Sequence, residues 1–113
     1  ISHKDAQFGL PETGLGILPA QIAPFVVKRV GLTQARRLAL LGARFDGSKA
    51  LQFGVVHEVA ENEKQLEQLI EITLEQILRA APLASRATKA LLHRASSNEA
   101  LSLLLDDAAA QFE

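Results

Sequence analysis

One carboxylate in this sequence, that of Glu12, lies where its chemistry could be used. It follows Leu10 and Pro11 and precedes the apolar residues 15–19, in a stretch shaped by proline and glycine. A carboxylic acid held among apolar groups keeps its proton more tightly than one in water, so it could transfer protons near neutral pH. The alternative is an ordinary glutamate on a solvent-exposed turn, which the loop by itself favours slightly.

Basic residues gather in two stretches that could bind phosphate groups through charge-assisted hydrogen bonds. Every charged residue within 13–45 and within 76–98 is Lys or Arg. The members are Lys28, Arg29, Arg36, Arg37 and Arg44 in the first stretch, and Arg79, Arg86, Lys89 and Arg94 in the second. Composition alone favours the simpler alternative, in which these side chains are solvated helix faces or cations near helix C-termini.

Other catalytic and metal-binding patterns are missing from the sequence. The histidines are His3, His57 and His93, without the HExxH spacing of a zinc site, and there is no cysteine. No P-loop, dinucleotide-binding or nucleophile-elbow motif occurs, and the glycines at 14 and 16 are explained by loop geometry. We therefore expect no metal site.

Composition limits the class of protein. The 113 residues allow one small domain, and a net charge of -1 argues against a dedicated nucleic-acid binder. A hydrophobic share of 48% suits a packed core, and no apolar run is long enough to cross a bilayer. The lack of cysteine and of a secretory signal is consistent with a cytoplasmic location. The chain has no methionine, so we expect it to be a processed product or a piece of a longer protein.

The elements that position these residues are predicted to be mostly helical, since 18 Ala and 19 Leu stand against 6 Val and 6 Ile. Residues 6–9 predict a short strand, followed by the Glu12 loop. The helices are predicted at 24–30, from an N-cap at Thr33 to Leu41, from an N-cap at Ser48 to Phe53, from Glu63 onward, at 82–96, and from an N-cap at Asn98. Residues 44–45 and 55–59 predict further strand pieces, which would need partners from outside the chain.

Several segments, in order and without large gaps, resemble the enoyl-CoA hydratase/isomerase (crotonase) family. They are DAQFGLPE and GLGILPA within residues 5–20, ARRLALLGARFD at 35–46, residues 50–59, and residues 81–89 with APLA and TK. The resemblance implies an α/β (α+β) crotonase fold. Residues 1–31 would be the end of its β-β-α spiral core with the catalytic loop, and residues 32–113 an incomplete, mostly helical C-terminal region. The family's oxyanion-hole N–H donors and a second glutamate would belong to an N-terminal half before residue 1.

The resemblance also implies roles for residues. Glu12 would be one of two glutamates that handle water and protons when water adds across the double bond of an enoyl thioester. The remaining substrate-binding positions would be Pro11, Leu18, Pro19 and Ala20, and candidates for contact with the CoA phosphates are Arg36, Arg37, Lys89 and Arg94. CoA would be part of the substrate, so no separate cofactor is expected.

Residues 19–27, PAQIAPFVV, replace the glycine-rich turn of common short-chain hydratases. They are similar to the turn of hydratases that act on branched glutaconyl-type CoA esters. Such hydratases take part in the breakdown of leucine or acyclic terpenes. Two alternatives remain open: an enoyl-CoA isomerase, or an inactive piece that serves only in subunit interaction. The resemblance further implies a homotrimer or a dimer of trimers.

Overall fold

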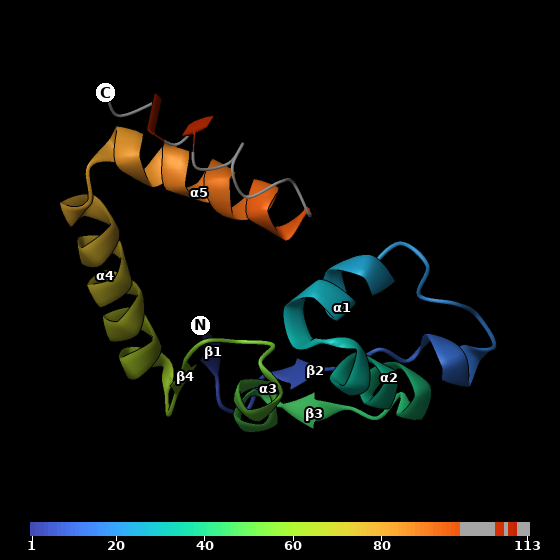
Figure 1. The fold of residues 1–113 in the computed structure, drawn as a ribbon. Helices are drawn as coiled ribbons and strands as arrows, with labels where there is room; N and C mark the ends of the chain where they lie inside the picture. The colour runs from blue at the N-terminus through green and yellow to red at the C-terminus, as the bar shows by residue number, and fades with distance from the viewer. Residues whose placement is uncertain (98–105, 108, 111–113) are drawn as a thin grey trace. The chain divides into compact units, whose positions relative to one another are not determined.

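The computed structural model describes residues 1–97, 106–107 and 109–110. Its elements in chain order (Figure 1) are β1 (Ser2–His3), β2 (Gln7–Phe8), the 3-10 helix η1 (Glu12–Leu15), α1 (Ala23–Val30), α2 (Leu32–Leu41), β3 (Phe45–Asp46), α3 (Gly47–Phe53), β4 (Val59–Ala60), α4 (Glu63–Arg79) and α5 (Pro82–Ser96). The helix expected from Asn98 onward falls almost entirely outside the described residues.

The chain forms two compact units, Ile1–Glu71 and Ile72–Glu113, with the boundary inside α4. The first unit contains every strand that the described residues form, η1 and the helices α1 to α3. The second contains the C-terminal part of α4 and α5. The family-based division at residue 31 stays a prediction.

The strands pair within the first unit, so the expectation that they need partners from outside the chain was wrong. β1 runs parallel to β4, with Ser2 opposite Val59, and β2 runs antiparallel to β3, with Phe8 opposite Phe45. Each ladder joins segments far apart in the sequence. The short strand expected at 6–9 is confirmed as β2.

The strand expected at 55–59 was wrong except at its last residue. The amides of Val55 and Val56 both bond to the carbonyl of Ala50, at 2.9 and 3.4 Å, as the chain leaves α3 through Gly54. These two valines complete the end of a helix and cannot join a ladder. Their β-branched composition therefore gave a misleading signal.

The core of the first unit is small. Its buried hydrophobic residues are Ala35, Leu38, Ala50 and Ala60. Phe45 stacks on Phe8, with ring centroids 5.6 Å apart, and meets the edge of Phe53 at 5.4 Å. This aromatic cluster joins both strands of the β2–β3 ladder to α3.

Two of the expected helix caps were wrong. Asp46, not Ser48, caps α3: its Oδ1 accepts a hydrogen bond from the amide of Lys49 at 2.9 Å. The residue preceding α2 is Gly31, and Thr33 lies inside the helix. Asp46 is the cap because its extended backbone places the carboxylate in front of the free amides in the first turn of α3.

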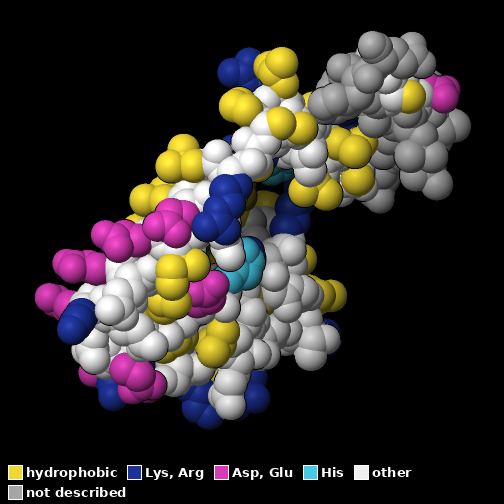
Figure 2. All heavy atoms as spheres, turned by 90° about the vertical axis from the view of Figure 1, so that its left-hand side faces the viewer, with side chains coloured by type: hydrophobic (Ala, Val, Ile, Leu, Met, Phe, Trp, Pro, Cys, Tyr) yellow, Lys and Arg dark blue, Asp and Glu magenta, His cyan; other side chains and the backbone are white. Residues whose placement is uncertain are grey.

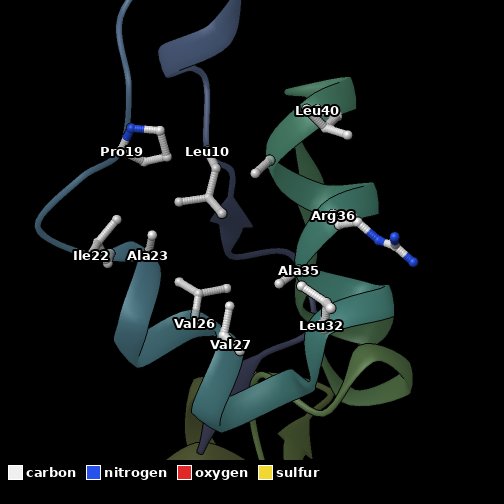
Figure 3. A pocket seen from close by; sticks show the side chains of 11 residues that line it. Leu10, Pro19, Ile22, Ala23, Val26, Val27, Leu32, Ala35, Arg36 and Leu40 are labelled. Atoms are coloured by element: carbon white, nitrogen blue, oxygen red, sulfur yellow. The ribbon is translucent and has the colours of Figure 1, made fainter.

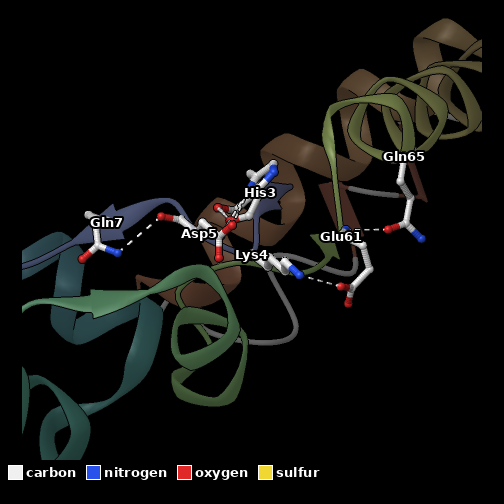
Figure 4. A network of polar contacts seen from close by, with 7 residues as sticks. His3, Lys4, Asp5, Gln7, Glu61 and Gln65 are labelled. Atoms are coloured by element: carbon white, nitrogen blue, oxygen red, sulfur yellow. Dashed lines mark hydrogen bonds and ion pairs between the residues drawn. The ribbon is translucent and has the colours of Figure 1, made fainter.

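Polar contacts near the N-terminus connect β1 to the start of α4 (Figure 4). Lys4 Nζ donates to Glu61 Oε2 at 3.1 Å, and this bond and charge raise the pKa of Lys4 above its ordinary value. Asn62 Oδ1 accepts from the amide of Gln65, and Gln65 Oε1 accepts from the amide of Glu61. The Asn62 bond caps the start of α4, and the Gln65 bond connects the first turn of the helix to the residue before the cap.

The second unit carries uncovered apolar side chains. Leu78 is 82% exposed on α4 and Leu83 is 75% exposed on α5. Arg94 forms an ion pair with Asp107 at 2.7 Å. Figure 2 shows acidic side chains gathered along one side of the face in view, beside hydrophobic side chains that remain uncovered.

Candidate functional site

The candidate acid/base, Glu12, begins the 3-10 helix η1. The turn closes through backbone hydrogen bonds from Gly14 to Pro11 O at 3.1 Å, and from Ile17 to Glu12 O at 3.0 Å. Gly16, with φ 76°, ends it in the left-handed conformation that glycine adopts at little cost. The sequence predicted a loop here, and the structure gives it a regular turn.

The Glu12 side chain is half-buried. Its Oε2 atom is buried, and no hydrogen-bond donor among the described residues reaches it. A buried carboxylate oxygen without a partner costs free energy, so such a group is uncommon in a folded protein. The side chain is therefore neither a freely solvated turn glutamate nor part of a structural ion pair.

The C-terminal end of α2 supports this turn. Thr13 Oγ1 donates a hydrogen bond to the carbonyl of Ala39 at 2.9 Å. Gly42, which ends α2 with φ 62°, lies so close that a Cβ there would be 3.5 Å from Leu10 O and 3.6 Å from Thr13 Oγ1. The chain on both sides of Glu12 is thus in contact with one helix end.

An apolar cavity of about 210 Å³ lies between α1 and α2. Figure 3 shows Val26 and Val27 of α1 facing Ala35 of α2. The lining residues are Leu10, Pro19, Ile22, Ala23, Val26, Val27, Leu32, Ala35, Arg36, Ala39 and Leu40. The guanidinium of Arg36 points away from the cavity, so only its stem contributes to the wall (Figure 3).

The predicted substrate residues are not brought together in one wall. Pro19 lines the apolar cavity. Pro11 lines a separate hollow of about 350 Å³ beside Gly42 and Arg44. Leu18 is 82% exposed, and Ala20 is exposed as well. Their roles stay predictions.

The predicted phosphate-binding cations fall in different units. Arg36 and Arg37 are on α2, and the guanidinium carbon of Arg37 lies 5.8 Å from the ring centroid of Phe53. Lys89 lines an open hollow on α5 in the second unit, where Arg94 is paired with Asp107. The four cations are therefore divided equally between the two units, and their roles stay predictions.

Sequence reasoning missed two features of this site. The pairing of α1 with α2 as walls of one cavity was not predicted, although residues 19–27 were singled out; the apolar spacing of Ile22, Val26 and Leu32 is the signal that could have found it. The Thr13 anchor had a weaker signal: a hydroxyl directly after the glutamate in an otherwise apolar loop.

Comparison with known proteins identifies the protein family to which this chain belongs. The sequence pattern of the family described as enoyl-CoA hydratase/isomerase matches residues 1–112. The chain belongs to the enoyl-CoA hydratase/isomerase family. Glu12, its turn and the apolar cavity all lie inside the matched region.

Two solved structures share the fold of the chain. Pseudomonas aeruginosa AtuE is 65% identical with a TM-score of 0.91, over 97% of this chain and 42% of that one. An enoyl-CoA hydratase/isomerase from Marinobacter aquaeolei is 59% identical with a TM-score of 0.89, over 95% of this chain and 40% of that one. The expected mixed helix-and-strand crotonase fold is thereby confirmed, as part of a larger domain.

A curated family member is similar over nearly the whole chain. The mevalonyl-coenzyme A hydratase sidH of Aspergillus fumigatus is 35% identical over 94% of this chain and 41% of its own length. The chain thus spans well under half of such relatives. No helix among the described residues is long and apolar enough to cross a membrane.

Proposed function

We propose that this chain is the C-terminal part of an acyl-CoA hydratase, a lyase that adds water to an α,β-unsaturated CoA thioester. The observation that carries the proposal is the Glu12 carboxylate, which is presented on a fixed turn with one buried oxygen that has no hydrogen-bond partner among the described residues. The match to the hydratase/isomerase family over residues 1–112 supplies the reaction class.

The chemistry requires more than Glu12. Water adds at the β-carbon, and negative charge develops on the thioester oxygen, which needs hydrogen-bond donors. One carboxylate helps to activate the water, and a carboxylic acid delivers a proton to the α-carbon. In the proposal Glu12 performs one of these two proton transfers. The second glutamate and the oxyanion donors come from the N-terminal half of the family's domain, and the full-length protein means this chain together with that half.

We propose a branched, glutaconyl-type acyl group for the substrate. Bulky residues occupy the turn after Pro19 where common short-chain hydratases carry glycines, and Ile22, Val26 and Val27 line the apolar cavity. An apolar wall of this kind suits the hydrocarbon branch of such an acyl group, which gains free energy as it leaves water. CoA arrives as part of this substrate, and no further cofactor is proposed.

The decisive experiment measures hydration by the full-length protein, followed by loss of the enoyl thioester absorbance. We expect turnover of 3-methylglutaconyl-CoA or isohexenylglutaconyl-CoA to exceed that of crotonyl-CoA. Glu12→Gln should lower turnover by roughly two to four orders of magnitude, since it removes a positioned acid/base. Affinity for the CoA ester should change far less, because the amide has the same size.

The matched control is Glu67→Gln, which makes the same change on an exposed face of α4 and should leave turnover unchanged. A Glu12→Gln enzyme with normal turnover would remove Glu12 from the mechanism. Double-bond migration without water uptake would identify an isomerase instead. The 113-residue chain alone should be inactive, and activity there would refute the need for the missing half.

We propose that the CoA phosphates contact one or more of Arg36, Arg37, Lys89 and Arg94. Neutralising a contacting cation should weaken CoA-ester binding roughly twofold to fivefold, with the difference shrinking at high salt. Arg94 should show the smallest effect, because Asp107 already offsets its charge. Unchanged affinity in all four variants would make these stretches solvated surfaces only.

We also propose that the full-length protein is a cytoplasmic homotrimer or dimer of trimers. The support is the set of uncovered apolar side chains, among them Leu83 and Leu92 on α5. Sedimentation equilibrium should give a trimer or hexamer mass at micromolar concentration, and a monomer would refute the assembly. A chain that assembles but does not turn over substrate would favour the subunit-interaction alternative.

A further inference from the structure

From these contacts we infer that Thr13 is a positioning residue for the Glu12 acid/base, acting through its hydrogen bond to the end of α2. This inference rests on the proposed function, because it concerns the geometry of the group assigned to proton transfer. It adds a requirement that the family match does not supply: the acid/base turn must be anchored to the helix that also lines the apolar cavity.

The first step concerns what holds the Glu12 side chain in place. Its Oε2 atom has no hydrogen-bond partner among the described residues, so no such bond fixes the direction of that oxygen. The position of the carboxylate therefore follows from the backbone of η1. A single 3-10 turn of four residues has little stability of its own, although its backbone hydrogen bonds are formed. It needs an external anchor to hold a side chain within catalytic tolerance.

The second step concerns why the end of α2 can serve as that anchor. The last carbonyls of an α-helix have no partner within the helix. The amide of Gly42 makes the last bond of the helix, to the carbonyl of Leu38 at 3.1 Å, and no backbone bond from the described residues beyond the helix reaches the next carbonyl, that of Ala39. Thr13 Oγ1 donates to this carbonyl at 2.9 Å. One bond thus satisfies a helix end and fixes the residue after Glu12.

The third step concerns the other side of Glu12. Gly42 adopts φ 62°, and a Cβ at this position would lie 3.5 Å from Leu10 O and 3.9 Å from Pro11 Cα. The segment before Glu12 is therefore packed on the same helix end as Thr13. The turn is held at two points, of which only Thr13 is a side-chain hydrogen bond that substitution can remove cleanly.

The consequence is a mechanical link between the acid/base and the acyl cavity. Ala35, Ala39 and Leu40 of α2 line the apolar cavity, and the Ala39 carbonyl accepts the Thr13 bond. An acyl chain in this cavity would contact α2, and the Glu12 turn is bonded to the same helix. The helix α2 would thus hold the substrate and the acid/base in one arrangement. Loss of the Thr13 hydroxyl should spare substrate binding and impair the chemical step, since small misplacements of a catalytic group are costly.

The test uses the full-length protein with Thr13→Val, which keeps the shape of the side chain and removes its hydroxyl. We expect kcat to fall roughly 10- to 100-fold while KM stays within about twofold. Thr13→Ser, which keeps the hydroxyl, should recover most of the lost kcat. Thr33→Val is the matched control, because Thr33 is an exposed residue of α2 that lines none of the cavities described above. The kcat of this variant should equal that of the wild type.

Each outcome discriminates between the claims. A normal kcat in Thr13→Val overturns the positioning role. A Thr13→Ser enzyme that loses as much kcat as Thr13→Val overturns it as well. If Thr13→Val fails to fold, the kcat of Thr13→Ser decides the question. A parallel Glu12→Gln measurement separates the two claims. Loss of turnover in Glu12→Gln with a normal Thr13→Val enzyme refutes only this inference, whereas normal turnover in Glu12→Gln refutes the proposed function.

Discussion

The two compact units hold their structure by different kinds of contact. In the first unit, hydrogen bonds join segments far apart in sequence, such as Thr13 to Ala39 and Gly47 to Lys4. Buried residues occur there, including Leu38 and Ala50. Among the described residues of the second unit none is buried. Contacts between distant segments thus place the Glu12 turn, whereas the described side chains of α5 are all at least partly exposed.

The largest effect expected from this comparison is at Gly47, where α3 approaches the N-terminal segment. A Cβ at Gly47 would collide with the carbonyl of His3, and the Gly47 amide bonds to Lys4 O at 2.9 Å. We expect Gly47→Ala to lower the free energy of unfolding by about 3 kcal/mol or more, because the backbone must move. Urea denaturation of the full-length protein measures this loss.

The matched control for Gly47 is Gly14, in the same unit. A Cβ there would meet nothing within 4 Å, so Gly14→Ala should be close to neutral. Equal stability in the two variants would contradict the view that long-range backbone contacts hold the first unit.

A second pair compares one leucine from each unit. Leu38 is 7% exposed and Leu78 is 82% exposed. In the 113-residue chain, Leu38→Ala should cost about 2–3 kcal/mol, as for a buried leucine, and Leu78→Ala should stay within about 0.5 kcal/mol of the wild type. Urea denaturation of the chain checks both values. A larger loss for Leu78→Ala in the full-length protein would show that another segment or subunit covers this face of α4.

The same contrast explains which sequence predictions were correct. The helices at 63–79 and 82–96 were predictable because an apolar period, a proline or a polar cap defines each one locally. The Glu12 loop was recognisable from its own residues. Caps at Thr33 and Ser48 were wrong because several nearby residues could cap, and backbone geometry selected Gly31 and Asp46.

The remainder depended on contacts across the chain. No local feature of the sequence indicates that Ser2 pairs with Val59, or that the hydroxyl of Thr13 bonds to a carbonyl 26 positions away. The valines at 55–56 looked like a strand because composition does not show that their amides are hydrogen-bonded to the carbonyl of Ala50 at the end of α3. Tertiary placement decided each of these cases.

Helix starts provide a smaller test of the comparison. In α4 the Asn62 side chain caps the helix, whereas Ala81 before α5 provides no side-chain cap, although its backbone is extended as a cap residue requires. Asn62→Ala should lower the free energy of unfolding by about 1 kcal/mol, and Ala81→Asp should raise it by about 0.5–1 kcal/mol. Thermal unfolding of both variants measures the changes. A destabilising Ala81→Asp would mean that the start of α5 is covered in the full-length protein.

The smallest expected effect is the pH dependence of the Lys4–Glu61 contact in the first unit. Glu61 raises the pKa of Lys4 above the ordinary value of 10.5, so the folded state binds this proton more tightly than the unfolded state does. The resulting stabilisation is complete below the unfolded pKa and is lost as the pH rises through the raised, folded-state value. Lys4→Gln should therefore reduce the free energy of unfolding slightly at about pH 8 and leave it unchanged at about pH 11.5, with less effect at high salt. Lys64→Gln, on the exposed first turn of α4, is the control and should show no such difference between the two pH values. A pH-independent loss in Lys4→Gln would mean that the packing of its stem, and not the charge pair, connects β1 to the start of α4.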